Sequence, residues 1–270
     1  MTLLSERWVE RDGLLWSPAL TALGLVAGFT TRERGSMAGG VHPLAEQARN
    51  REALARALGF ERVVRVKQVH GATVVQADDV GEPWPEADAL WTATPGLLLG
   101  VAAADCVPLL LGDPGSGVVG AAHAGWEGTS RRVVQALVAR MVQAGARTER
   151  LVAAIGPSIG PCCYAIDAAR AETIRERLGA DAADALQLEA ADRTASAGSP
   201  TGPDRTGTAD RPGRIVFDLW TANAQQLAQS GVRSIERADL CTRSGGANIW
   251  SHRGESGRNG TGLGVIGLPR

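Results

Sequence analysis

The chain has 270 residues, of which 44% are hydrophobic, and its 28 basic residues almost balance its 29 acidic residues. This length can bury a substantial core, and the net charge of -1 argues against binding the phosphate backbone of a nucleic acid. The longest apolar run, residues 96–111, contains Asp105 and is too short to span a bilayer. We therefore expect a small-molecule partner, and neither a nucleic acid nor a membrane.

The four cysteines are Cys106, Cys162, Cys163 and Cys241, and their spacing does not match the disulfide framework of a secreted domain. The N-terminus lacks the basic start and continuous apolar core of a signal peptide. These features predict reduced thiols and a cytoplasmic location.

The first regular elements are predicted around a histidine. Residues 45–58 carry an apolar helical face, and Gly59 follows where a left-handed cap would end the helix. Residues 63–69 and 73–76 are rich in β-branched side chains, which predicts two strands on either side of His70. In a straight strand, His70 would share one face with the apolar side chains and point inward.

The next two predicted strands each lead to a candidate ligand. Residues 97–104 form a continuous apolar run typical of a strand buried on both faces, and Cys106 follows its end. Residues 118–122 repeat this pattern, and His123 follows them before a helix. The apolar stripe of that helix comprises Val134, Leu137, Val138, Met141 and Val142.

A strand is also predicted at residues 151–155, before a loop whose Pro and Gly residues restrict the backbone path. The loop contains the adjacent Cys162 and Cys163, whose side chains are expected to point in different directions. We favour a structural role for them over a catalytic thiol, because no cationic group nearby in the sequence would lower a thiol pKa. Asp167 is expected to cap the following helix, and Gly179 to end it.

The composition then changes to small and polar residues, and residues 180–214 are predicted to form a flexible surface insertion. Regular structure resumes with a strand at 215–217, and Asp218 is expected to cap a helix that Gly231 ends. The last predicted strand is 264–268.

His70, Cys106 and His123 all fall at predicted strand ends or turns. Each residue alone would more often be a packed or hydrogen-bonded core residue than a ligand. Their shared placement favours a common site, because three protein ligands leave catalytic zinc one open position. Asp105 would either orient a ligand histidine or cap a turn.

Four further residues are candidates for substrate binding. Arg32, Arg253 and Arg258 lie among Gly and Ser residues, where a guanidinium could bind phosphate, although each could be an ordinary surface charge. Trp126 directly follows the His123 turn and could stack on a flat ring or pack in the core.

Four motifs in this order resemble the YfiH family of laccase-domain proteins, which includes multicopper polyphenol oxidase-like and purine nucleoside phosphorylase-like members. They are residues 67–71 (KQVHG), 104–108 (ADCVP), 122–126 (AHAGW) and 155–164 (IGPSIGPCCY). The resemblance extends from residues 29–32 to residues 251–253.

This resemblance implies one α/β (α+β) domain over residues 1–270, with mixed β-sheets layered with helices. It also implies that His70, Cys106 and His123 are zinc ligands. Family members are described as phosphorolysing adenosine, inosine and methylthioadenosine and as deaminating adenosine, and bacterial relatives are linked to editing of peptidoglycan precursors.

The chain also departs from the family pattern near the expected site. Residues 39–43 replace a longer Gly-rich segment, and Glu127 stands where a basic residue is usual. Ala165 stands where an acidic residue is usual, and Ser244 lies in a segment that commonly has an aromatic residue and an acid. These changes affect the expected substrate contacts, whereas the three ligands are intact.

The leading hypothesis is a cytoplasmic, zinc-dependent purine nucleoside phosphorylase with adenosine deaminase activity, using Arg32 or Arg253 to bind phosphate. A nucleoside and phosphate would be its partners, and the protein would be a monomer or homodimer. One alternative is a hydrolase of peptidoglycan precursors with Cys106 as nucleophile. Another is a copper polyphenol oxidase, which four histidines and no His-X-His pair disfavour. In a fourth hypothesis, the protein is a non-catalytic binding module, and the metal has only a structural role.

Overall fold

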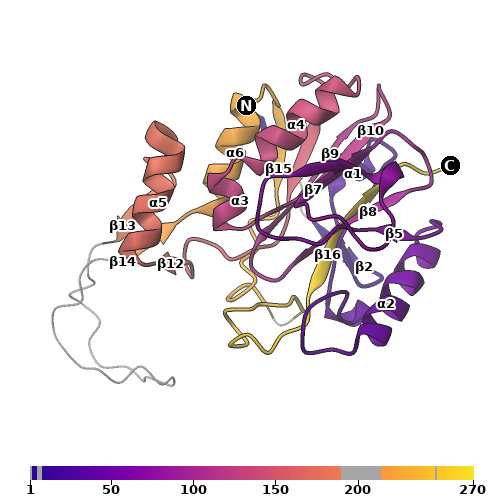
Figure 1. The fold of residues 1–270 in the computed structure, drawn as a ribbon, viewed down its shortest axis with the longest axis horizontal. Coiled ribbons are helices and arrows are strands. Elements are labelled where there is room, and N and C mark those ends of the chain that lie inside the picture. Colours follow the sequence, from indigo (N-terminus) through magenta and orange to yellow (C-terminus); the bar gives the residue numbers. More distant parts are fainter. Residues whose placement is uncertain (1, 5–7, 190–213, 247) are drawn as a thin grey trace.

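The computed structural model describes residues 2–4, 8–189, 214–246 and 248–270, which form three β-sheets and the helices around them (Figure 1). The largest sheet has seven strands and contains both parallel and antiparallel pairs. Its strands, in spatial order, are β1 (Thr2–Leu4), β15 (Ser234–Arg237), β11 (Val152–Ile155), β9 (Val107–Asp113), β10 (Val118–Ala124), β7 (Ala89–Thr92) and β6 (Val74–Gln76).

A six-stranded sheet and a three-stranded sheet complete the β-structure. The order of the former is β2 (Val9–Arg11), β3 (Leu14–Trp16), β4 (Val26–Thr30), β16 (Gly262–Gly267), β8 (Leu98–Ala103) and β5 (Val63–Val64). The order of the latter is β12 (Ala165–Ile166), β14 (Arg214–Phe217) and β13 (Leu186–Glu189).

Six α-helices and three short 3₁₀ helices connect these strands in the described residues. The α-helices are α1 (Pro18–Thr21), α2 (Leu44–Ala57), α3 (Trp126–Ser130), α4 (Val133–Gln143), α5 (Ala168–Leu178) and α6 (Leu219–Gln229). The 3₁₀ helices are η1 (Arg32–Arg34), η2 (Ala77–Asp79) and η3 (Gly179–Ala182). None of the helices described here combines the length and apolar character that crossing a membrane requires.

The two large sheets pack face to face between helices. Helices α3, α4 and α6 lie together on the outer face of the seven-stranded sheet, whereas α2 covers the six-stranded sheet on the opposite side (Figure 1). Strand β9 shows why the centre is apolar throughout. Leu109 and Leu111 pack toward the helices, whereas Leu110 packs toward the other sheet, so the strand is buried on both faces. The predicted fold, with mixed sheets layered with helices, is confirmed.

Most predicted elements are found close to their predicted positions. Helix α2 ends as expected, and Gly59 follows it with a φ of 80°. The prediction of a strand over residues 63–69 is wrong beyond Val64, because the chain leaves the sheet there. Instead, the side-chain amide of Gln68 bonds the backbone N–H and carbonyl of Ala102. Val142 does not belong to the buried stripe of α4, since 42% of it is exposed.

The predicted caps of α5 and α6 are present. Asp167 accepts a hydrogen bond from the Arg170 N–H, and Asp218 accepts bonds from two N–H groups of α6. The predicted start of the insertion at Ala180 is too early, because Leu186–Glu189 pairs with β14. Residues 190–213 lie outside the described residues, so flexibility there stays a prediction.

The β9–β10 hairpin has two of the candidate ligands at one end and, at the other, a buried carboxylate paired with a partly exposed arginine. The Asp113 carboxylate is fully buried and accepts hydrogen bonds of 3.0 and 2.8 Å from Arg150. It also accepts bonds of 2.9 Å from the N–H groups of Arg147 and Gly115. Burial raises the pKa of Asp113, but these bonds outweigh it and hold the pKa at about 2.

Because the pKa of Asp113 is lower in the folded state, its stabilising contribution is complete above pH 4 and declines as the pH falls toward 2. We expect Asp113→Asn to lower the free energy of unfolding by about 1–3 kcal/mol at pH 7 and pH 5, and by less at pH 3. Urea unfolding at the three pH values measures this. The exposed Asp12→Asn serves as control, with an expected change below about 0.5 kcal/mol. An equal loss at all three pH values for Asp113→Asn would contradict the assignment.

Candidate metal centre

His70, Cys106 and His123 come together in the structure. The Sγ of Cys106 and one ring nitrogen of each histidine all lie within 4.8 Å of one another. The imidazole rings are 4.8 Å apart between centroids and nearly perpendicular, at 82°. His123 is buried, Cys106 is partly buried and His70 is exposed, so the cluster opens to solvent on one side.

The register of the β9–β10 pair explains how two of these residues meet. His123 lies within β10, rather than after it as predicted, and pairs with Pro108 near the start of β9. Cys106 lies in the turn immediately before β9. Asp105, with a φ of 88°, adopts the left-handed conformation in this turn. Antiparallel pairing therefore places Cys106 beside His123.

His70 reaches the cluster from a loop held by a buried carboxylate. Asp88 accepts hydrogen bonds from the backbone N–H groups of Val69, His70 and Gly71, at 3.2, 3.0 and 2.6 Å. His70 itself has a φ of 59°, a conformation that is uncommon for a residue with a side chain. The expectation that strand alternation turns His70 inward was wrong, because this loop, and not a strand, directs the imidazole.

Asp88 also orients His123. Its Oδ1 lies 2.9 Å from Nδ1 of His123, and both side chains are buried. This contact leaves Nε2 of His123 for a metal, the arrangement common for histidine ligands of metals. Asp105 does not have this role, since it accepts hydrogen bonds from the Thr242 and Ser251 hydroxyls and the Arg253 N–H, at 2.6, 2.7 and 2.6 Å.

The clustered groups shift one another's pKa. Burial raises the pKa of the Cys106 thiol, but the His123 imidazolium and hydrogen bonds from both histidines outweigh it and lower the pKa to about 6. Burial lowers the pKa of His123, but the Cys106 thiolate and Asp88 outweigh it and raise the pKa to about 9. Both shifts favour the charged pair, a thiolate beside an imidazolium. A metal cation would replace the imidazolium proton.

The donor set fits a catalytic metal ion. One thiolate and two imidazoles are ligands that zinc accepts, and three protein ligands leave one position open. Gly125 keeps the space beside them free, because a Cβ there would lie 2.8 Å from Cys106 Sγ and 3.2 Å from His70 Cδ2. Copper(II) also accepts imidazole and thiolate, so the donors alone do not identify the metal.

The cluster lies in the wall of a cavity of about 620 Å³, a size typical of small-molecule sites. Trp126 and Arg253, two of the predicted substrate-binding residues, line the same cavity. The residues of the cavity wall that bear polar or aromatic side chains are Gln68, His70, Asp105, Cys106, His123, Trp126, Glu127, Tyr164, Arg170, His252, Arg253, Asn259 and Thr261.

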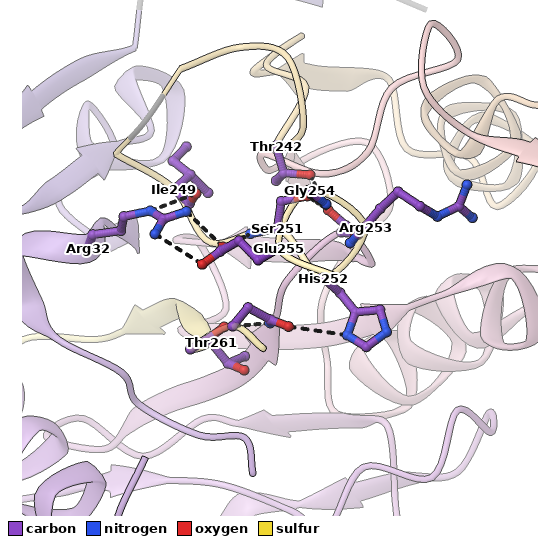
Figure 2. A network of polar contacts seen from close by, with 12 residues as sticks. Arg32, Thr242, Ile249, Ser251, His252, Arg253, Gly254, Glu255 and Thr261 are labelled. Carbon is purple, nitrogen blue, oxygen red and sulfur yellow. Dashed lines mark hydrogen bonds and ion pairs between the residues drawn. The ribbon is translucent and has the colours of Figure 1, made fainter. Parts of the chain in front are cut away.

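The structure does not bring Arg32 into this cavity. Its guanidinium stacks over Trp250 and forms an ion pair of 2.8 Å with Glu255. Figure 2 shows Arg32 turned toward Glu255 and the carbonyl of Ile249, whereas the side chain of Arg253 extends away from them. Arg258 also lies outside the cavity wall. Among the predicted arginines, only Arg253 is therefore placed to contact a substrate.

Several cavity residues were not found by sequence reasoning. Gln68 stands in the first motif, which could have drawn attention to it. Arg170 lies in the first turn of α5, with its guanidinium 5.1 Å from the Trp126 ring. Tyr164 follows the two adjacent cysteines, and burial raises its pKa to about 12. Neither Arg170 nor Asp88 belongs to a motif, so no local signal pointed to them.

The sequence matches a family of known proteins. A family model described as multi-copper polyphenol oxidoreductase laccase matches residues 27–269. The chain belongs to this family. The purine nucleoside phosphorylase of Deinococcus radiodurans is 41% identical over 256 residues, which cover 90% of this chain and 88% of that protein. Purine nucleoside phosphorylase YlmD of Geobacillus stearothermophilus is 33% identical and covers 96% of this chain and 95% of its own length.

Solved structures of the family have the same fold. The crystal structure of YlmD from Geobacillus stearothermophilus superposes with a TM-score of 0.77 and 29% identity, over 97% of this chain and 99% of that chain. The hypothetical protein YfiH of Bacillus licheniformis also gives a TM-score of 0.77, with 26% identity over 96% and 97% of the two chains. The resemblance to the YfiH family is thus confirmed.

Asp88→Asn tests the architecture of the centre. An amide at this position cannot accept all the hydrogen bonds that the carboxylate accepts, so we expect zinc affinity to fall by about 10- to 100-fold. Competition with a chromophoric chelator measures the affinity, and circular dichroism checks the fold. Asp78→Asn, which alters a carboxylate bonded by Thr92 and Thr94 outside the centre, is the matched control. Equal affinity in the wild type and Asp88→Asn would show that Asp88 does not support the ligands.

Proposed function

We propose that the protein is a zinc-dependent purine nucleoside phosphorylase that acts on adenosine, inosine and methylthioadenosine and also deaminates adenosine. The observation that carries the proposal is the His70, Cys106 and His123 cluster in the wall of a cavity large enough for a nucleoside. The names of the relatives support it. The proposal includes a cytoplasmic location and a monomer or homodimer.

The cavity offers separate surfaces for the parts of a nucleoside. Trp126 and Tyr164 present aromatic rings on which a purine can stack. Because the pKa of Tyr164 is about 12, its hydroxyl keeps its proton at neutral pH and can donate a hydrogen bond. Glu127 also lines the cavity, 3.5 Å from Arg131, so this position accepts hydrogen bonds and does not bind phosphate.

Phosphate is expected to bind between the arginines of the wall. The Arg253 guanidinium lies 5.7 Å from the Tyr164 ring centroid, and among the described residues no ion pair of Arg253 is found, which leaves this group for an anion. Its backbone N–H bonds Asp105, which fixes the loop beside Cys106. Arg170 lines the same wall and contributes a second positive charge, although its guanidinium also lies 3.8 Å from the exposed Asp167 carboxylate. Two guanidinium groups stabilise the charge of a phosphate that attacks the ribose anomeric carbon.

A zinc ion held by the three ligands would supply a Lewis acid at the open position. The surrounding residues position the ligand side chains and leave room for the substrate. Asp88 holds the imidazole of His123 and the loop of His70 in place, and Gly125 leaves space beside the ligands. The arginines and the metal site share one cavity, so phosphorolysis and hydrolytic deamination can use the same bound nucleoside.

The first test is an assay of the purified protein with one equivalent of zinc. We expect adenosine to give adenine and ribose 1-phosphate only with phosphate present, and inosine without phosphate. Cys106→Ser is the control, with an expected loss of activity of about 100-fold or more, since it removes a ligand. Absence of adenine, inosine and hypoxanthine at full zinc occupancy would overturn the proposal.

Arg253→Met separates phosphate binding from the rest of the reaction. We expect the KM for phosphate to rise by about 10-fold or more, because hydrogen bonds to a charged group contribute about 1.5–3 kcal/mol. Deamination, which uses no phosphate, should change much less. Arg258→Met removes an arginine of the same loop that lies outside the cavity, so it is the matched control. An unchanged KM in Arg253→Met would show that phosphate binds elsewhere.

A second candidate is a hydrolase of peptidoglycan precursors with Cys106 as the nucleophile. The observation in its favour is a chain of contacts from Cys106 to His123 and from His123 to Asp88. The three groups are thus arranged like the nucleophile, base and orienting carboxylate of a catalytic triad. Metal analysis distinguishes the two, because a thiolate bound to zinc is not free to attack. Full activity in metal-free protein, together with rapid alkylation of Cys106, would favour the hydrolase.

A further inference from the structure

A second group of thiols lies outside the centre described above. Cys162 and Cys163 stand in the loop between β11 and β12, and Cys241 comes from the segment after β15. Their three sulfur atoms all lie within 4.8 Å of one another, and those of Cys162 and Cys163 are 3.4 Å apart. The expectation that the adjacent cysteines point apart was therefore wrong, because the turn at 161–163 brings both sulfurs to the same side.

The surroundings of Cys241 favour a thiolate. The Gly160 N–H donates a hydrogen bond of 3.3 Å to its Sγ, and the N–H groups of Arg243 and Ser244 also donate to this sulfur. Converging backbone N–H groups stabilise an anion. Gly160 is required for this approach, since a Cβ there would lie 2.7 Å from the Trp220 ring.

The cluster can reach metal-binding geometry with little movement. Thiolate ligands at about 2.3 Å from a common ion are about 4 Å from one another in a trigonal arrangement. The observed separations are 3.4 Å for Cys162 and Cys163 and at most 4.8 Å for the other two pairs, so small side-chain movements reach this arrangement. Cys162 is exposed and Cys163 is partly buried, so an ion can enter from solvent.

We propose that Cys162, Cys163 and Cys241 form a second metal site, which binds a soft cation of the copper(I) class through three thiolates. Sulfur-only coordination selects soft ions, whereas the imidazoles of the first centre suit zinc. The three thiols bring together two segments that are far apart in the sequence. No other chemistry of the proposed phosphorylase uses these thiols.

Both segments that carry the three cysteines also contact the cavity that contains the first metal centre. Tyr164 follows Cys163 and lines the cavity. Thr242 follows Cys241 and donates a hydrogen bond of 2.6 Å to Asp105, the neighbour of Cys106. An ion at the cluster would thus join the two loops that hold this wall of the cavity.

The test is an anaerobic titration of the reduced, full-length protein with copper(I) buffered by a chromophoric chelator. Cys106→Ser, which removes the thiolate of the first centre, should keep one tightly bound copper(I) ion. We expect Cys106→Ser/Cys163→Ser and Cys106→Ser/Cys241→Ser to bind this ion about 100-fold more weakly, since each lacks one thiolate. X-ray absorption of the Cys106→Ser complex should show three sulfur neighbours at about 2.3 Å.

Circular dichroism and urea unfolding check that the cysteine variants fold, and serine is chosen because it nearly preserves the side-chain volume. If a variant fails to fold, X-ray absorption on Cys106→Ser alone decides. Nitrogen neighbours in place of sulfur, or equal copper(I) affinity in Cys106→Ser and the two double variants, would overturn the proposal. So would the absence of tight copper(I) binding to Cys106→Ser.

Discussion

The buried carboxylate of Asp88 holds the centre together. It accepts three backbone N–H groups of the loop around His70 and contacts the Nδ1 of His123, so one side chain positions two ligands from different parts of the chain. A buried anion is costly unless it is fully hydrogen-bonded. These bonds keep the pKa of Asp88 low despite its burial, and the carboxylate remains available as an acceptor.

Local sequence pattern was sufficient to locate two of the three clustered residues. Cys106 and His123 lie close to the ends of apolar runs, and runs of that kind predict buried strands correctly because both faces of these strands are covered. Local pattern could not determine the register of β9 against β10, which places the two residues side by side. It also could not predict His70 correctly, because the course of its loop depends on hydrogen bonds to a carboxylate 18 residues away.

Local sequence pattern also could not identify which carboxylate, Asp88 or Asp105, orients His123. Asp105 was one candidate for an orienting carboxylate because it adjoins Cys106 in sequence, yet its bonds go to Thr242, Ser251 and Arg253. Asp88 precedes β7, and the pairing of β7 with β10 sets it beside His123. The cysteine cluster depends on tertiary structure in the same way, since Cys241 meets the adjacent cysteines through the bridge between Ser158 and Cys241. The periodicity of a sequence does not show which distant strands will be in contact.

The family's description as a multi-copper laccase can be weighed against the imidazoles that this chain has. A trinuclear copper cluster needs many histidines, whereas the chain has four. His42 contacts the edge of Trp250 and His252 bonds Asn259, so only His70 and His123 share a cluster. The imidazoles therefore support a single histidine-ligated metal ion with an open position, beside arginines that suit an anionic substrate. Such a site is better suited to a phosphate-dependent reaction in which the metal acts as a Lewis acid than to electron transfer among several copper ions.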